Sequence, residues 1–402
     1  MAFKQLFKGS ENKSIKMKKT VKKILEWELG TLARSVYRRF RPYVIGITGS
    51  SGKTTTKYIV GKLISTVRKT AVAEGNLNTE IGLPMAVLGY QKPPETIFEF
   101  IAVFLGAPFK ALFFKSDANF LVLEYAADKP GDMEVLTKII PPDIAIITNI
   151  GVAHIGAFKS VEKIAKEKWK LAQAAKDFVV CNEEIMKKTS NFSQPKAKVR
   201  LTGNIETVLA KNIEVHTNKT SFDLYLEAKK YHTEFGYLGK FIVRDLELSV
   251  LAVNLATGES DKIIKQIKNL KPQVGRGERV VGRRDILILD ESYNANPLSM
   301  LAALEVLQST KYGRKVAILG QMAEIEPIAE KSHREIAEVS SKIADYTIGV
   351  GEGFRNCKLD KWYPNVEELG KEVNDLLQPG DTVLVKGSYH SNHLEKIVEK
   401  LK

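Results

Sequence analysis

A glycine-rich turn near residue 50 constrains the fold of this chain more than any other stretch. An apolar run at residues 43–45 leads into the sequence GITGSSGKTTT at residues 46–56, and a pattern with helical spacing follows. A strand that turns in this way into a helix points unpaired backbone N–H groups and the positive end of the helix dipole at one place. The sequence therefore predicts a phosphate-binding loop, formed by Gly49, Ser50, Ser51, Gly52, Lys53, Thr54 and Thr55.

Two side chains of this loop have distinct expected roles. Lys53 carries a mobile positive charge for the terminal phosphates, and Thr54 offers a hydroxyl to Mg²⁺. The usual spacing, G-x-x-x-x-G-K-[ST], would place glycine at position 47, where the chain has Ile47. We interpret the segment as a variant phosphate loop because a strand and a helix flank it in the expected order. The alternative is a glycine-rich turn with an incidental lysine.

The composition is that of a globular protein with two or three domains. The chain has 402 residues, of which 44% are hydrophobic and 27% charged, so each domain can have its own core. Cys181 and Cys357 make neither a disulfide framework nor a zinc site, which favours a reducing cytoplasm. The nearest approach to a membrane span, residues 97–114, is interrupted by charges and a proline, and no secretory signal precedes it.

The first 41 residues are predicted to form a basic arm. They hold twelve Lys and Arg against three Glu, a net charge of +9. Apolar residues at helical spacing predict an amphipathic helix there: Val21, Ile24, Leu25, Leu29, Leu32, Ala33 and Val36. The helix either packs on the next domain with a solvated face or docks peripherally on the anionic inner face of a membrane. We expect no nucleic-acid partner, because no aromatic-interleaved motif accompanies the charge.

Apolar runs that alternate with helical patterns predict a parallel-sheet domain at residues 42–272. Strands that are apolar on both sides are typical of a sheet covered by helices, and they are expected at 43–47, 120–125, 144–148 and 178–181. Ligands of such sheets bind at the carboxyl ends of the strands, where the glycine-rich loop and Glu124 fall. Residues 197–240 alternate in polarity and predict an antiparallel appendage, and helical patterns follow at 244–257 and 260–268.

Pro and Gly within residues 271–277 mark a domain boundary, after which a second β/α alternation begins. Its expected strands are 285–290, 315–319, 346–350 and 382–386, and its expected helices are 298–309, 328–343, 366–377 and 391–401. The predicted fold class is α/β, with a basic arm at 1–41, a central P-loop ATPase domain at 42–272 and a smaller, Rossmann-like C-terminal domain at 273–402.

Six stretches follow one another in a set order: TGSSGKTT at 48–55, GNLNTEIGLP at 75–84, LEYAADKPGD at 123–132, TNIGVAH at 148–154, DESYNANP at 290–297 and VKGS at 385–388. This ordered set resembles the Mur ligases, the ATP-dependent amide-forming enzymes of cell-wall peptide synthesis. It is most similar to the branch that adds D-alanyl-D-alanine to a UDP-N-acetylmuramoyl tripeptide. The resemblance implies that ATP activates a carboxylate as an acyl phosphate, which an amine then attacks. Cations and preorganised donors should supply most of the catalysis, because each step gathers negative charge.

The resemblance also implies two Mg²⁺ sites. Glu124 ends a buried strand, where an ionised carboxylate is costly unless a cation pairs with it; the alternative is a carboxylate that points into solvent. By resemblance, Glu124 and Thr54 would hold Mg²⁺ near the ATP phosphates, and Asn149 would hydrogen-bond nearby. His154 is by its spacing either a structural residue or a metal ligand, and the resemblance implies a ligand of the second Mg²⁺.

A helix is expected at 161–175, and its apolar stripe contains Lys168. The other lysines of this helix fall on the polar side: Lys163, Lys166 and Lys170. A lone buried ammonium is costly and its pKa should fall, which leaves a neutral amine able to react with CO₂. The resemblance implies such a carbamylated lysine at Lys168, completing the second Mg²⁺ site with His154. The alternative is a lysine that extends from the edge of the stripe to water.

The remaining site residues rest on the resemblance. Asn76 and Asn78 would line the peptide-carboxylate site, and Lys386 and Ser388 would hold the amine substrate. The nucleotide would be contacted across the domain cleft by Arg276, Asp290, Asn294 and Asn296. The alternative for the asparagines is a role in helix capping or turns.

Some features depart from the family's pattern. About forty residues precede the first strand, so we expect the family's N-terminal sugar-nucleotide domain to be missing. Residues 240–243, Gln321 and Tyr389 also differ from the family's motifs. Two alternatives to a cell-wall ligase stay open: a folylpolyglutamate-type amino-acid ligase, and a catalytically silent, membrane-docked scaffold that binds nucleotide. We expect a small-molecule or peptide substrate, a monomeric protein and a cytoplasmic location, peripheral to the membrane if the arm docks there.

Overall fold

The computed structural model describes residues 23–402 except 74, 95 and 217. Its central domain is built on a six-stranded parallel sheet in the order β2-β3-β1-β4-β5-β6, which confirms the predicted sheet. The strands are β1 (Tyr43–Thr48), β2 (Thr70–Val72), β3 (Phe120–Glu124), β4 (Ile144–Ile147), β5 (Phe178–Asn182) and β6 (Lys198–Thr202). Ile47 of β1 pairs with Glu124 on one side and Ile146 on the other. The turn after β1 therefore lies beside the end of β3.

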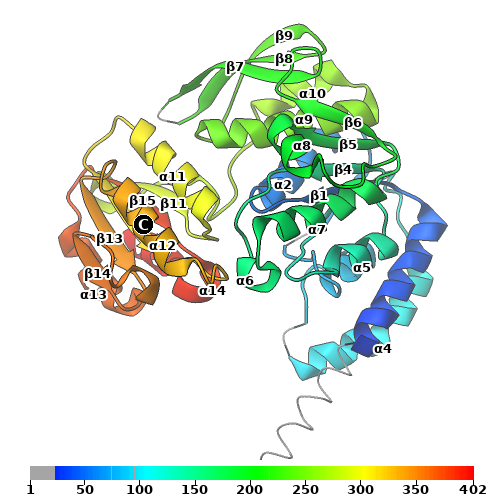
Figure 1. The fold of residues 1–402 in the computed structure, drawn as a ribbon, viewed down its shortest axis with the longest axis horizontal. Coiled ribbons are helices and arrows are strands. Elements are labelled where there is room, and N and C mark those ends of the chain that lie inside the picture. The colour runs from blue at the N-terminus through cyan, green and yellow to red at the C-terminus, as the bar shows by residue number, and fades with distance from the viewer. Residues whose placement is uncertain (1–22, 74, 95, 217) are drawn as a thin grey trace, which may run out of the picture.

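Helices cover both faces of this sheet (Figure 1). One face packs against α2 (Lys53–Ile64), α9 (Lys240–Thr257) and α10 (Ser260–Ile267). The other packs against the helix at residues 23–40 and against α3 (Gly82–Val87), α4 (Ile97–Phe113), α5 (Asp132–Ile139), α6 (Ile155–Phe158), α7 (Val161–Ala174) and α8 (Glu183–Thr189). Val44 and Ile45 of β1 belong to the opposite cores. The strands are apolar throughout because both of their faces are buried.

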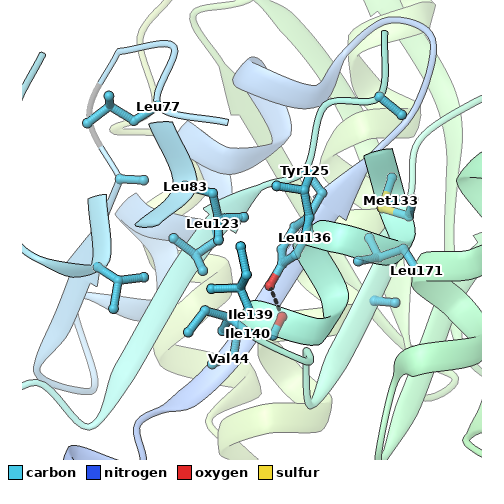
Figure 2. Close-up of a cluster of buried hydrophobic side chains, with 14 of the residues drawn as sticks. Val44, Leu77, Leu83, Leu123, Tyr125, Met133, Leu136, Ile139, Ile140 and Leu171 are labelled. Atoms are coloured by element: carbon cyan, nitrogen blue, oxygen red, sulfur yellow. Dashed lines mark hydrogen bonds between the residues drawn. The ribbon is translucent and has the colours of Figure 1, made fainter. Parts of the chain in front are cut away.

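Packing in the core beneath α5 and α7 explains why position 46 is a glycine. Tyr125 follows β3, is fully buried, and donates its hydroxyl to the carbonyl of Ile140 at 2.7 Å (Figure 2). A Cβ on Gly46 would come within 2.8 Å of the Tyr125 ring. Gly46 is therefore required by packing inside β1, and the first glycine of the phosphate loop is Gly49.

The antiparallel appendage is confirmed, with one correction. It consists of β7 (Val208–Val215), β8 (Thr220–Leu226) and β9 (Lys229–Phe235). Its inner side chains, Phe222, Leu224 and Phe235 among them, share a core with α9. The first strand of the stretch assigned to the appendage, β6, instead pairs in parallel with β5 and extends the central sheet.

The C-terminal domain has a six-stranded sheet in the order β10-β11-β15-β12-β13-β14, with only β10 antiparallel to its neighbour. Its strands are β10 (Glu278–Val281), β11 (Leu287–Glu291), β12 (Lys315–Gly320), β13 (Tyr346–Val350), β14 (Lys361–Tyr363) and β15 (Thr382–Lys386). Its helices are α11 (Pro297–Ser309), α12 (Ala329–Ser340), α13 (Val366–Leu376), α14 (Tyr389–Asn392) and α15 (Glu395–Leu401), with 3-10 turns at Arg283–Asp285 and Glu352–Phe354. The helix expected at 391–401 is in two parts because His393, with φ of 49°, is left-handed and ends α14.

The predicted arm is described from residue 23 onward. Residues 23–40 form a helix that buries Leu25, Leu29, Ala33 and Val36 against the central domain. Ile24 departs from the predicted stripe and is 49% exposed, and Val21 lies outside the described residues. Within the described part of the chain, no helix is long and apolar enough to cross a membrane.

Candidate active site

The loop between β1 and α2 is held in shape by the segment after β4. The N–H of Ser50 donates to the carbonyl of Asn149 at 3.1 Å, and the Ser50 hydroxyl donates to the carbonyl of Gly151 at 2.8 Å. The side chain of Asn149 accepts from the N–H of Ser51 at 2.9 Å and donates to the Ser51 hydroxyl at 2.8 Å. Asn149 thus holds two successive loop residues in place: Ser50 through its backbone carbonyl and Ser51 through its side chain.

Two loop glycines are required by close approach. A Cβ on Gly49 would lie 1.8 Å from the hydroxyl oxygen of Thr148. Gly52 has φ of 78°, and a Cβ there would lie 2.5 Å from Oδ2 of Asp245 on α9. Only glycine fits these positions without strain, so the close packing of the loop against Thr148 and Asp245 determines both residues.

Glu124, at the end of β3, faces the start of α2. Its Oε2 accepts from the Thr54 hydroxyl at 2.9 Å, and its Oε1 accepts from the amide of Asn78 at 2.9 Å. Burial alone would raise the pKa of Glu124, but the positive charges of Lys53 and Lys57 and the Asn78 hydrogen bond hold the pKa below its usual value. Glu124 is therefore a buried, ionised carboxylate and does not point into solvent.

Lysines of α2 neutralise this carboxylate. Lys57 is buried, lies 3.7 Å from Glu124 and donates to the carbonyl of Gly75 at 2.9 Å. Burial lowers the pKa of Lys57. Lys53 folds back over the loop and donates to the carbonyl of Gly49 at 3.0 Å. Glu124 already has protein cations around it, so its burial does not by itself require a metal.

Lys168 is the one lysine of α7 that is fully inside. It is 2% exposed, whereas Lys163 and Lys166 are exposed and Lys170 is half-buried, as the helical pattern predicts. Burial, together with the nearby charge of Lys53, lowers the pKa of Lys168 to about 7. The carboxylates of Asp128, Glu167 and Glu124 act in the opposite sense but do not cancel this effect. Lys168 therefore lies in the electrostatic neighbourhood of the loop.

His154 joins the two domains. It has a left-handed backbone, with φ of 54°, directly before α6. Its Nδ1 lies 2.7 Å from Oε2 of Glu324, a residue of the C-terminal domain, and its Nε2 lies 3.5 Å from Oδ1 of Asp128. His154 thus stands at the domain boundary with carboxylates on both sides.

The C-terminal domain approaches the loop through its first helix. Asn296 caps α11 and also donates its amide to the carbonyl of Ser50 at 3.4 Å. Arg276 stacks on the ring of Tyr293, with its guanidinium carbon 3.9 Å from the ring centroid, and its charge lowers the pKa of both Glu124 and Lys57. Asn296 therefore caps α11 and at the same time faces the glycine-rich loop.

Other predicted residues have local contacts. Asp290 is buried and accepts from the N–H and hydroxyl of Ser292, and the side chain of Asn294 accepts from the N–H of Ala295. Lys386 is buried and donates to the carbonyl of Asn294 at 3.0 Å, with Glu291 at 3.4 Å. Asn76 is exposed, and its carbonyl accepts from the N–H of Asn78 at 2.9 Å, whereas Ser388 is buried at the start of α14.

Four site residues escaped the sequence reasoning: Lys57, Asp128, Asp245 and Glu324. Lys57 lies one helical turn after Lys53, and Asp128 lies in the LEYAADKPGD motif at 123–132. The position of each in the sequence could therefore have indicated a role in the site. Asp245 is a charge among apolar residues of α9, which is also a signal. Glu324 follows β12 without a local pattern, and only the meeting of the domains brings it to His154.

The residues present fit an Mg²⁺–nucleotide complex. Among the described residues, no three or more His, Cys, Asp or Glu side chains are grouped to hold a metal by themselves. Mg²⁺ with a nucleotide needs fewer, because it usually takes one or two protein oxygens and completes its shell with phosphates and water. Thr54 and Glu124 offer such oxygens directly after the glycine loop.

Comparison with known proteins agrees with this geometry. The model of the Mur ligase middle domain matches residues 47–253, and that of the Mur ligase glutamate ligase domain matches residues 275–389. The UDP-N-acetylmuramoyl-tripeptide–D-alanyl-D-alanine ligase of Borreliella burgdorferi is 29% identical over 372 residues, which cover 88% of this chain and 73% of that protein.

Solved structures give the same picture. The crystal structure of MurF ligase from Thermotoga maritima in complex with ADP matches with a TM-score of 0.79 and 26% identity, covering 94% of this chain and 83% of that one. A folylpolyglutamate synthase from Mycobacterium tuberculosis matches with a TM-score of 0.65 over 92% of this chain and 95% of that one. At 15% identity, this second match concerns the fold alone.

Proposed function

The chain belongs to the Mur ligase family, and we propose that it is an ATP-dependent peptide ligase that adds D-alanyl-D-alanine to the peptide of a UDP-N-acetylmuramoyl cell-wall precursor. The substrates in this proposal are those in the names of its relatives. The observation that carries the chemistry is the pairing of Thr54 with the buried carboxylate of Glu124, directly after a glycine loop that leads into the N-terminus of α2. That arrangement suits a metal-bound triphosphate.

The side chains have separate tasks in this proposal. The loop N–H groups and Lys53 hold the phosphates, and Arg276 and Asn296 close on them from the second domain. Thr54 and Glu124 supply oxygen ligands to Mg²⁺. ATP, when bound, supplies activation of the acceptor carboxylate as an acyl phosphate. Preorganised charge of this kind acts without reorganisation during the reaction and is usually the largest contribution to rate.

Lys168 carries a carbamate in this proposal. Its neutral amine attacks CO₂: an N–C bond forms as one C–O π bond opens, and the nitrogen loses one proton to solvent, so that a neutral buried amine becomes an anion. Burial and then the positive charge of Lys53 lower the pKa of Lys168, and a carbamate there would attract that charge. Together with His154, the carbamate would hold a second Mg²⁺.

The direct test is a ligation assay read by product mass. The protein is incubated with ATP, Mg²⁺, UDP-N-acetylmuramoyl tripeptide and D-alanyl-D-alanine, and phosphate release is followed in parallel. A product heavier than the acceptor by one dipeptide residue, with one phosphate released per product, supports the proposal. No product, together with phosphate release that does not depend on the dipeptide, rejects it.

The same assay separates the alternatives. A folylpolyglutamate-type ligase would instead elongate a folate acceptor with glutamate, and a silent scaffold would bind nucleotide without amine-dependent phosphate release. Running both acceptors with both amines in one panel distinguishes all three.

We also propose that residues 1–41 bring the enzyme, as a monomer, to an anionic membrane surface. Their net charge is +9, and each exposed basic residue contributes about 1 kcal/mol near such a surface. The test is flotation with anionic vesicles, using a variant in which the seven lysines of residues 1–22 are glutamine. Equal flotation of both proteins, or flotation unaffected by salt, counts against this role.

A further inference from the structure

Helix α4 presents an apolar face to solvent. Its outward side carries Phe98, Ile101, Phe104, Leu105, Phe109, Leu112 and Phe113, of which Phe98 and Phe113 are 80% and 72% exposed. None of the exposed residues that the structure describes in α4 is polar. Monomeric proteins rarely expose contiguous apolar surface of this kind unless it is a binding site.

The orientation of α4 is fixed by its inner side. Val103, Ala107 and Ala111, spaced by four residues, are buried in the core of the central domain. The packing of this side on the core turns the aromatic side of α4 away from the domain. The exposed face is therefore a stable feature of the fold.

Each end of α4 makes hydrogen bonds to side chains of the same protein. Thr96 and Glu99 form a capping box at its start. At its end, Arg39 donates to the carbonyls of Ala111, Leu112 and Phe114 at 2.8–3.2 Å. These bonds lower the cost of moving the two ends of the helix into an apolar environment.

A second helix beside α4 also exposes apolar side chains. The helix at residues 23–40 runs beside α4 at the corner of the molecule away from the C-terminal domain (Figure 1), and Phe40 contacts Phe114 edge to face at 5.5 Å. It adds Ile24 and Trp27, the latter 73% exposed. Nine of the fifteen large hydrophobic side chains exposed in the described chain thus lie on these two helices.

The surrounding charge is positive. The chain before residue 23 holds seven lysines and one glutamate, and it leads directly into the helix that carries Trp27. Arg38, Arg41 and Lys115 are exposed on or beside the two helices. Basic residues around an apolar helical face with a tryptophan are typical of surfaces that insert into anionic lipid. A protein partner would be expected to meet hydrogen-bonding groups as well, which the outward face of α4 lacks in the described residues.

We propose that α4, with Ile24 and Trp27, inserts its apolar face into the interfacial layer of an anionic lipid bilayer. The choice of an anionic surface rests on the membrane contact proposed for residues 1–41. The choice of α4 as the inserted helix rests on its exposed apolar side chains. The helix lies in the plane of the membrane surface, and the basic residues meet the lipid headgroups.

Vesicle binding of the full-length protein tests this inference. Phosphatidylglycerol-rich vesicles are titrated into the wild type, Phe109→Asp and the control Val281→Asp, whose parent residue is 69% exposed in the C-terminal domain against 67% for Phe109. Phe109→Asp should bind vesicles about tenfold or more weakly, because it removes one aromatic ring that would be buried in lipid and adds a charge. Val281→Asp should bind as the wild type does. Trp27 fluorescence should shift to the blue on binding, and Trp27→Phe should lose that shift.

Each other outcome has a defined meaning. Equal vesicle binding by Phe109→Asp and the wild type, with binding still abolished by salt, would leave the basic arm as the docking element and overturn the role of α4. No vesicle binding, together with a dimer in sedimentation that Phe109→Asp dissociates, would overturn the inference in favour of a second copy of the chain. Ligation of soluble substrates should be the same in the three proteins, so this result is independent of the proposed ligase activity.

Discussion

The carboxylate of Asp245 lies directly beneath Gly52 of the phosphate loop. A Cβ at position 52 would come within 2.5 Å of Oδ2, and that oxygen has no hydrogen-bond partner in the described chain. Burial raises the pKa of Asp245 to about 8. A neutral carboxyl at this position avoids repelling the phosphates that the loop is built to receive.

Replacing Gly52 by alanine should weaken nucleotide binding. The substitution forces a side chain into a left-handed backbone and against Asp245, and strained backbone of this kind costs about 1–3 kcal/mol. The measurement is calorimetric titration with ATP and Mg²⁺. Gly370→Ala in α13 is the control, because a Cβ there meets nothing within 4 Å; it should bind ATP normally and unfold at the same or a higher temperature.

Asp245→Asn should stabilise the protein, more at pH 8 than at pH 5. Between its ordinary value of 3.8 and about 8, the carboxyl is ionised in the unfolded chain but protonated in the folded one. Folding therefore takes up a proton, and stability falls with rising pH by up to about 1.4 kcal/mol per pH unit in this window. The amide does not titrate and escapes this loss. Thermal unfolding of both proteins from pH 5 to pH 9 measures the difference, and a constant gap across that range contradicts the explanation.

Lys53→Ala should slow ligation strongly. Removing one preorganised charge at a developing phosphate charge costs about 3–4 kcal/mol, or roughly 10²–10³ in rate. Lys62→Ala, in the same helix but on its exposed side, is the control and should keep normal turnover. Near-normal steady-state ligation by Lys53→Ala would remove the loop from the mechanism.

The central strands were predictable because they are buried on both faces. β1, β3, β4 and β5 are continuous apolar runs, and each was expected within two residues of its observed bounds. The strands β2, β10 and β14 were not expected, and β6 was expected only as part of the antiparallel appendage. They are three to five residues long, and each contains half-buried or exposed residues. Such edge strands are set by their neighbours and not by their own pattern.

The site was predictable where neighbouring strands of the parallel sheet carry the partners. Glu124 ends β3 and Asn149 follows β4, and these two strands flank β1, so a parallel sheet brings both residues to the loop. The contact of His154 with Glu324 was not predictable, because it depends on how the two domains meet. Asp245 lies under the loop only because α9 packs against α2. Contacts between distant segments leave no trace in local spacing.

The last prediction concerns Lys168 and the supply of CO₂. Lys168→Ala should abolish ligation but leave ATP binding largely intact, and a small carboxylate such as acetate should restore part of the activity by standing in for the carbamate. Lys166 is an exposed lysine of the same helix, so Lys166→Ala is the control and should remain active.

The pH dependence follows from the pKa of about 7, which burial and the charge of Lys53 impose on Lys168. Below this value the amine is protonated and does not react with CO₂. Wild-type activity in limiting bicarbonate should therefore fall as the pH drops from 8 to 6, and added bicarbonate should recover it at pH 8 but much less at pH 6. Carbamate can be followed apart from activity by ¹³C NMR with labelled bicarbonate, where a signal present in the wild type and in Lys166→Ala should be missing in Lys168→Ala. The same signal in all three proteins, or full activity of Lys168→Ala, would assign the carbamate elsewhere and leave Lys168 as a buried structural amine.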